Sequence, residues 1–235
     1  MTSRYITAGR GLAIGAGLAA AGYAGLVAWN RARYGKAVAP PETGRDSLLD
    51  RFIPAPEVVE HHQVNIAAPA DVVIAAAKEM RLLSSPLVRG VIRMRELAMG
   101  GRPDRRTHPD TLLAQAQSIG WVVLAERASR EIVLGAVTIP WHANPVFRSI
   151  PASEYEAFRE PGYVKIIWSL RADPVNDEHS VFHTETRVST TDPQARTKFR
   201  RYWSYVAPGV ELIRLAMLRP LKRDAERRFR KPVAA

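Results

Sequence analysis

A chain of 235 residues is long enough for one well-packed domain and an appendage. Apolar residues make up 46% and charged residues 24%, which excludes bulk disorder. There is no cysteine, so disulfides, thiolate metal sites and cysteine nucleophiles are excluded, while the compartment stays open.

The net charge of +11 is concentrated at the two ends of the chain. Residues 1–45 contribute +5 and residues 214–231 contribute +6, so residues 46–213 are neutral, with 20 basic and 20 acidic side chains. A nucleic-acid-binding domain usually carries a basic face on its folded body. Basic ends beside a hydrophobic segment are more typical of contact with an anionic lipid surface. We therefore expect membrane lipids, and not nucleic acid, as partners.

The first predicted element is an uncharged run, Gly11–Trp29, which as a helix would span about 28 Å, enough for a hydrocarbon core. A cleaved signal peptide is the alternative. Three cations directly after the run, and a poor cleavage context at residues 37–40, favour an uncleaved anchor. We predict a single-pass transmembrane anchor over residues 1–33, with the positive-inside bias placing the soluble domain in the cytoplasm.

Residues 34–57 are rich in proline, glycine and charge and indicate a linker with one helical turn near Ser47–Phe52. The domain begins near Val58, where apolar and polar residues alternate as in a strand. Further elements follow from periodicity and from turn residues. They are helices at Val72–Met80, Ser85–Met99 and Pro151–Glu160, a polar loop at Arg102–Asp110, and two antiparallel strand pairs, Trp121–Glu126 with Glu131–Thr138 and Tyr163–Ala172 with Ser180–Thr190.

A long terminal helix closes the domain. Asp192 can cap its first backbone amides, Pro193 suits its first turn, and Pro208 should bend it. Its apolar stripe needs a receiving surface, and most of the preceding chain is predicted as strand. We therefore predict an α+β fold in which an antiparallel curved sheet wraps on this helix over residues 58–220, followed by a basic tail at 221–235.

This order of elements resembles the START-like superfamily of SRPBCC domains, which have the helix-grip fold and include polyketide cyclases and lipid-binding proteins. The resemblance is carried by residues 64–73, a strand that passes through Ala-Pro-Ala-Asp into a helix, and by the final helix from Asp192 to Arg219. It covers residues 58–220. In that superfamily the sheet and the helix enclose a cavity for an apolar ligand, and activities range from carriers to cyclases, so the resemblance implies no particular reaction.

The inner face of the sheet supplies the candidate binding residues. Large aromatic side chains with a few hydroxyls suit a mostly apolar ligand. The same set describes an ordinary filled core, and this alternative stays open. We expect Phe199, Tyr202 and Trp203 to lie opposite the strand residues. The candidate set is Trp141, Trp168, Phe182, Thr184, Thr186, Phe199, Tyr202 and Trp203.

Other polar side chains are interpreted as surface groups. His179, His183 and Glu185 share a strand face that we expect to point to water, where ion pairing is favoured over metal binding. The same solvated interpretation is given to the hairpin carboxylates Glu126 and Glu131, the rim histidines His61 and His62, and the helix cations Arg200 and Arg201. No catalytic motif is present, and no metal or cofactor is predicted.

The leading hypothesis is a membrane-anchored domain that binds a hydrophobic small molecule or lipid between its sheet and its terminal helix. A cyclase- or hydratase-like enzyme that uses the same cavity, or a packed interaction module without ligand, are the alternatives. Cations of the terminal helix and tail would contact anionic headgroups. These membrane-surface residues are Arg219, Lys222, Arg223, Arg227 and Arg228.

Overall fold

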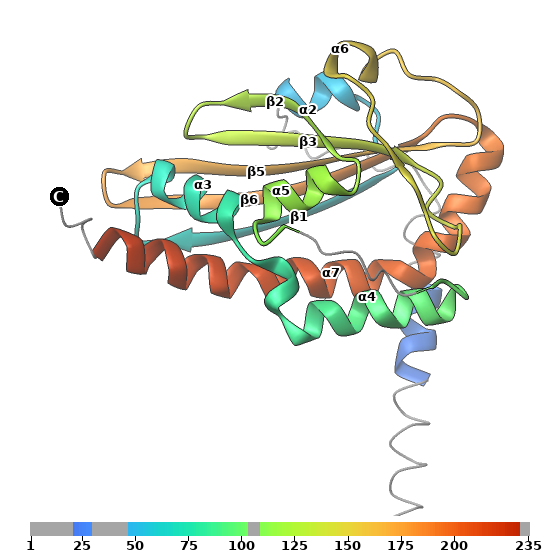
Figure 1. The fold of residues 1–235 in the computed structure, drawn as a ribbon, viewed down its shortest axis with the longest axis horizontal. Helices are drawn as coiled ribbons and strands as arrows, with labels where there is room; N and C mark the ends of the chain where they lie inside the picture. Colours follow the sequence, from blue (N-terminus) through green and yellow to red (C-terminus); the bar gives the residue numbers. More distant parts are fainter. Residues whose placement is uncertain (1–20, 30–46, 103–108, 231–235) are drawn as a thin grey trace, which may run out of the picture.

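The domain is built on one antiparallel sheet with the strand order β1-β6-β5-β3-β2, and a short β4 pairs with β3. The computed structural model describes residues 21–29, 47–102 and 109–230. The strands are β1 (Val58–Ile66), β2 (Val122–Arg127), β3 (Glu131–Thr138), β4 (Phe147–Arg148), β5 (Val164–Asn176) and β6 (His179–Thr190). Figure 1 shows the curved sheet with the longest helix running along one face.

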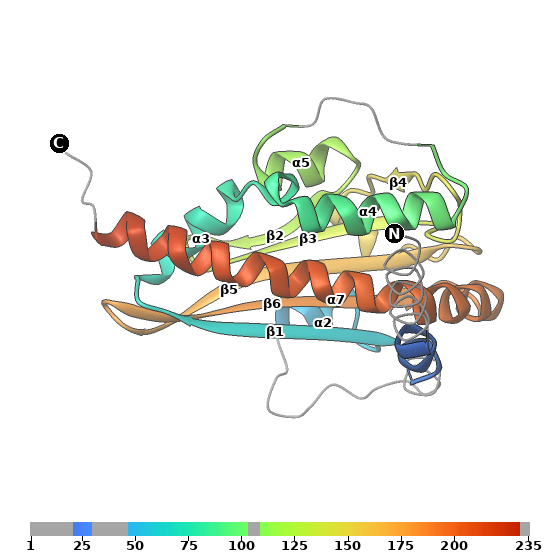
Figure 2. The ribbon, with the colours of Figure 1, turned by 90° about the horizontal axis from the view of Figure 1, so that it is seen from below.

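The helices lie on both faces of this sheet (Figures 1 and 2). They are α2 (Ser47–Phe52), α3 (Ala70–Glu79), the 3-10 turn η2 (Leu82–Ser84), α4 (Pro86–Ala98), α5 (Leu112–Ser118), α6 (Ala152–Tyr155) and α7 (Pro193–Arg230). Asp192 caps α7 as predicted, because its Oδ1 accepts hydrogen bonds from the amides of Gln194 at 2.8 Å and Ala195 at 2.9 Å. Pro208 lies inside α7, and the helix bends in its first half (Figure 1).

An antiparallel curved sheet with a long C-terminal helix fits the helix-grip fold, so the predicted α+β architecture is confirmed. The predicted anchor lies largely outside the described residues, since only residues 21–29 of it are described, and these are helical. Within the described ranges, no helix is both long and apolar enough to cross a membrane.

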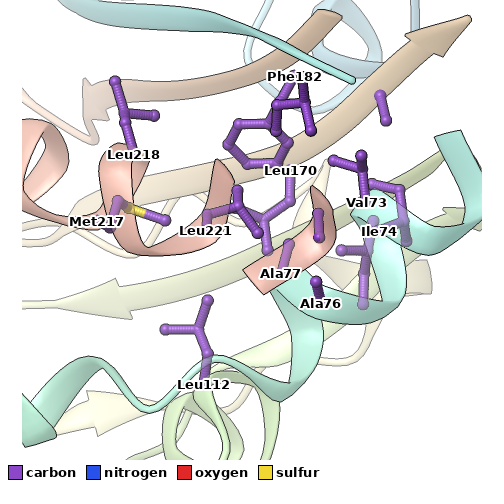
Figure 3. Close-up of a cluster of buried hydrophobic side chains, with 14 of the residues drawn as sticks. Val73, Ile74, Ala76, Ala77, Leu112, Leu170, Phe182, Met217, Leu218 and Leu221 are labelled. Atoms are coloured by element: carbon purple, nitrogen blue, oxygen red, sulfur yellow. The ribbon is translucent and has the colours of Figure 1, made fainter. Parts of the chain in front are cut away.

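The inner face, which α7 covers, carries two apolar clusters separated along the helix. One cluster, at the end near α3, packs Phe182 and Leu170 against Met217 and Leu221 of α7 and against Val73 of α3 (Figure 3). The other packs the start of α7 on the opposite end of the sheet. Its buried members are Val58, Val164, Val188, Phe199, Trp203 and Ala207.

The outer face of the sheet is covered too, which corrects the expectation that it points to solvent. A third apolar cluster joins Val133, Val137 and Ile167 to Leu49, Phe52, Ile53 and Tyr155, which come from α2, the residue after it, and α6. Lys165 and Ser169 are buried on this face. Part of the segment predicted as linker therefore belongs to the packed domain, which extends back to α2.

A buried ion pair fastens α2 to the sheet. The Arg187 side chain on β6 is fully buried and donates hydrogen bonds to the carboxylates of Asp50 on α2 and Glu185 on β6. Arg187 shares the β6 face of His183 and Glu185, which was expected to point to water. Instead, its charge is neutralised inside the structure by two carboxylates from separate elements, the arrangement that burial of a guanidinium requires.

Candidate functional site

A band of polar side chains crosses the inner face between the two apolar clusters. Glu60 and His62 on β1 lie opposite Thr186 and Thr184 on β6, and Trp168 on β5 lies opposite Thr186. Arg214 reaches this band from α7. We call these residues the inner polar belt: Glu60, His62, Trp168, Thr184, Thr186 and Arg214. Strand alternation aligns the strand members on one face, and α7 supplies the opposing cation.

Arg214 is the central charge of the inner polar belt. Its guanidinium carbon lies 3.9 Å from the centroid of the Trp168 ring, and its Nη2 donates to Thr186 Oγ1 at 3.0 Å. The Trp168 indole in turn donates to Thr184 Oγ1 at 2.7 Å. This stacking on an aromatic face together with a hydroxyl acceptor holds the planar guanidinium in one orientation.

Two polar atoms of the inner polar belt are buried without a hydrogen-bond partner among the described residues: Arg214 Nε and His62 Nε2. Burial lowers the pKa of Arg214 to about 9, opposed by the charge of Glu60, so the guanidinium stays charged at neutral pH. Burial also lowers the pKa of His62, against the charges of Glu60 and Glu211, so this imidazole is neutral at pH 7. The inner polar belt thus offers one fixed cation and one neutral imidazole.

The inner face is not fully covered around the cluster at the start of α7. Ile166 lies in β5, which has neighbouring strands on both sides, and its side chain points toward α7; even so, it keeps intermediate exposure. Tyr202 and Val210 on α7, which pack in the same cluster, are also only partly buried. These three side chains are therefore incompletely covered by the elements packed on the inner face.

Arg95 of α4 ties the cover of this region together. Its Nε donates to Tyr202 Oη at 3.1 Å, and its Nη2 donates to the backbone oxygens of Pro140 at 2.9 Å and His142 at 3.1 Å. Trp141, between these two acceptors, lines an open hollow of 710 Å³ at the start of α7, beside Gly162. Arg95 itself lines a second hollow of 440 Å³ beside α4.

The eight predicted binding residues fall into three places. Trp168, Thr184 and Thr186 lie in the inner polar belt, while Trp141 and Tyr202 lie at the loop that Arg95 holds. Phe182, Phe199 and Trp203 are members of the apolar clusters. The expectation that Phe199 and Trp203 oppose Trp168 was wrong: the bend of α7 carries them to the far end of the sheet, and Arg214 opposes Trp168 instead.

Sequence reasoning missed three members of the inner polar belt. Arg214 was counted with the basic tail, and Arg200 and Arg201, which were considered as cations near the aromatic stripe, are exposed. His62 was placed at the rim. The alternation of β1 does put His62 and Glu60 on the face that carries Val58 and Ile66, and this signal could have identified them.

The remaining candidates are engaged elsewhere. His183 contacts His61 Nε2 at 3.2 Å and Asp173 at 3.3 Å on the outer face. Glu131 is buried and pairs with Arg127 at 3.1 Å, whereas Glu126 pairs with Lys78. Among the described residues, no group of three histidine, aspartate or glutamate side chains could hold a metal ion.

All three of Lys222, Arg227 and Arg228 have polar partners within the domain, although Arg227 pairs within α7 and its side chain is 68% exposed. Lys222 donates to the Asn65 carbonyl at 2.7 Å, and Arg227 pairs with Asp224. Arg228 bridges Asp224 and Glu79, at 2.8 and 2.7 Å. Arg219 and Arg223 are exposed. Arg227 is exposed as well, so three of the five cations extend from α7 in the manner that headgroup contact requires.

No family model matches the chain, and no curated protein matches it. Similar solved structures include a protein from Thermobifida fusca (14% identity, 72% of this chain and 93% of that one, TM-score 0.33). They also include a Streptomyces ZhuI aromatase/cyclase (13%, 73% and 94%, TM-score 0.23) and a START superfamily protein from Mycobacterium smegmatis (8%, 68% and 99%, TM-score 0.22). At TM-scores this low the similarity carries no argument, and the helix-grip assignment rests on the sheet and α7.

Proposed function

We propose that this protein is a membrane-anchored binding domain for an amphiphilic small molecule or lipid, whose acidic group pairs with Arg214 in the inner polar belt. The observation that carries the proposal is the Arg214 guanidinium, which is stacked on Trp168 and hydrogen-bonded to Thr186, with Nε buried and given no acceptor by the described residues. A carboxylate or phosphate oxygen would satisfy that donor.

The surroundings of Arg214 suit the apolar part of such a ligand. Ile166, Tyr202 and Val210 form a partly open apolar surface next to the inner polar belt. A ligand chain on this surface would lose contact with water, and its acidic end would pair with the buried cation. The predicted anchor at residues 11–29 would keep the domain where lipid-like ligands are most concentrated.

A cyclase- or hydratase-like enzyme is the second candidate, and one observation favours it. His62 has an unpartnered Nε2 on the same inner face as Arg214, and burial keeps the imidazole neutral. A neutral imidazole can accept a proton from a substrate whose developing negative charge is stabilised by a nearby guanidinium. Turnover of an aromatic or polyketide substrate that is lost in His62→Gln would establish this role.

Binding is tested with the detergent-purified full chain, a long-chain carboxylate and the alcohol of the same chain length, followed by tryptophan fluorescence. We expect the carboxylate to bind more tightly, and Arg214→Gln to weaken its binding about tenfold or more, the worth of one charge-assisted hydrogen bond. Alcohol binding should change little. Native mass spectrometry of the same preparation would identify a co-purified ligand.

Arg200→Gln is the matched control, because Arg200 is an exposed cation on the same helix. It should leave the affinity for both probes unchanged. Equal affinity of the unmodified chain for carboxylate and alcohol, or an equal loss in both control and test variants, would refute the role of Arg214. Thermal unfolding of each variant separates lost binding from lost folding.

A further inference from the structure

The outward surface of α4 and α7 carries an unusual number of exposed apolar side chains. Met94 and Leu97 are 72% and 61% exposed, and seven-residue spacings on each helix place their apolar residues on one side. The two helices are in contact, because a Cβ on Gly209 of α7 would lie 2.9 Å from Val91 of α4. We call this surface the α4–α7 face. Its large apolar residues are Leu87, Met94, Leu97, Tyr205, Leu212 and Leu215.

Cations stand at both ends of the apolar stripe on α7. Arg201 precedes Tyr205 by four residues on the segment before the bend at Pro208. On the segment after the bend, Arg219 follows Leu212 by seven residues and Arg223 follows four residues later, so these two cations share the side of Leu212. All three side chains are exposed. The acidic side chains of this region are Glu96, which pairs with Arg93 at 3.1 Å, and Glu211. An apolar centre with cationic ends is typical of helices that lie in a membrane interface.

The N-terminal helical segment adjoins the same surface. The Tyr23 hydroxyl donates to the backbone oxygen of Tyr205 on α7. Residues 21–29, blue in Figures 1 and 2, lie on the side of α7 that faces away from the sheet. This segment is the end of the uncharged run Gly11–Trp29. The run predicted to enter a bilayer therefore meets the domain at the α4–α7 face.

We propose that the α4–α7 face rests on an anionic lipid bilayer, with its apolar residues in the interface and with Arg201, Arg219 and Arg223 at the headgroups. The proposal builds on the proposed membrane anchoring but concerns a different surface from the inner polar belt. It sets the orientation of the domain: the part of α7 after the bend at Pro208 lies along the bilayer, and the sheet is on the side away from it.

The absence of cysteine allows a site-specific test on the full chain. Met94→Cys and Leu215→Cys are each labelled with an environment-sensitive fluorophore, and the chain is reconstituted in phosphatidylcholine–phosphatidylglycerol vesicles that carry a lipid quencher. Val175→Cys is the matched control, because Val175 is an apolar residue that is 66% exposed on β5, outside the α4–α7 face. We expect several-fold stronger quenching at the two test positions, with a blue-shifted emission.

Quenching at Met94→Cys and Leu215→Cys that is no stronger than at Val175→Cys would overturn the proposal. The proposal would also be overturned if the emission from the test positions changed with the protein-to-lipid ratio but not with the lipid composition. That result would mean that a second protein copy covers the α4–α7 face. Charge reversal of Arg219 and Arg223 together should reduce quenching, most strongly at low salt. The carboxylate titration with Arg214→Gln is independent of these results, so failure of docking and failure of ligand binding are distinguishable.

Discussion

Replacing Asp50 by asparagine tests whether α2 is an integral part of the domain. The substitution removes one of two carboxylates from Arg187, whose side chain is fully buried, while Glu185 still accepts from Arg187 Nε. Breaking a buried ion pair costs about 3–5 kcal/mol. Asp50 is 30% exposed and one partner remains, so we expect a loss of about 2–3 kcal/mol in the free energy of unfolding. For a domain of this size that loss lowers Tm by about 5–10 °C.

Asp110→Asn is the matched control, because it makes the same chemical change in an ion pair with Arg81 whose side chains are 64% and 70% exposed. Exposed pairs contribute about 0–1 kcal/mol, so its Tm should move by about 3 °C at most. Both variants are compared by circular dichroism melting and by urea unfolding. Equal Tm shifts for the two variants would refute the conclusion that α2 is held by a buried charge pair.

Three further predictions concern the interior. Burial lowers the pKa of His62 and of His183 below the unfolded value of about 6.5, so the folded state should lose stability as the pH drops below 6.5. In curves of Tm against pH, His62→Gln should make this loss smaller. Gly135→Ala should cost about 1–3 kcal/mol in urea unfolding, since a Cβ there would crowd side chains on the outer face, whereas Gly90→Ala, in open space on α4, should gain about 0.5–1 kcal/mol. Phe182→Ala should cost about 3–5 kcal/mol, and a loss below 1 kcal/mol would contradict its placement in a packed cluster.

Local patterns were enough for the architecture. The alternation in Val58–Ile66, the Asp192-Pro193 start and the apolar stripe of the last helix each depend on neighbours in sequence, and both elements begin where they were expected. The last helix continues to Arg230, however, so most of the segment predicted as a basic tail at 221–235 is helical. The strand pairing followed because consecutive antiparallel strands join through short turns.

The outer layer and the inner polar belt depended on tertiary packing. Lys165 and Ser169 have the polarity of a solvated strand face, but α2 and α6 cover that face, which nothing in the alternation of β5 indicates. Arg214 belongs to a strongly basic stretch of sequence, and its direction is set by the register of α7 on the sheet. That register depends on the bend at Pro208. The spacing of residues along a straight helix does not give the direction of the side chains that follow the bend.

Pro208 gives the long helix α7 an internal joint. Pro208 has no amide hydrogen, so the Ser204 carbonyl accepts no helical hydrogen bond from it. The segment before the joint packs through Phe199 and Trp203, and the segment after it through Met217 and Leu221. Because Pro208 has already removed this hydrogen bond, a bend at this position does not break it. The bend therefore lets the two segments of α7 pack on different ends of the sheet, each through its own buried cluster.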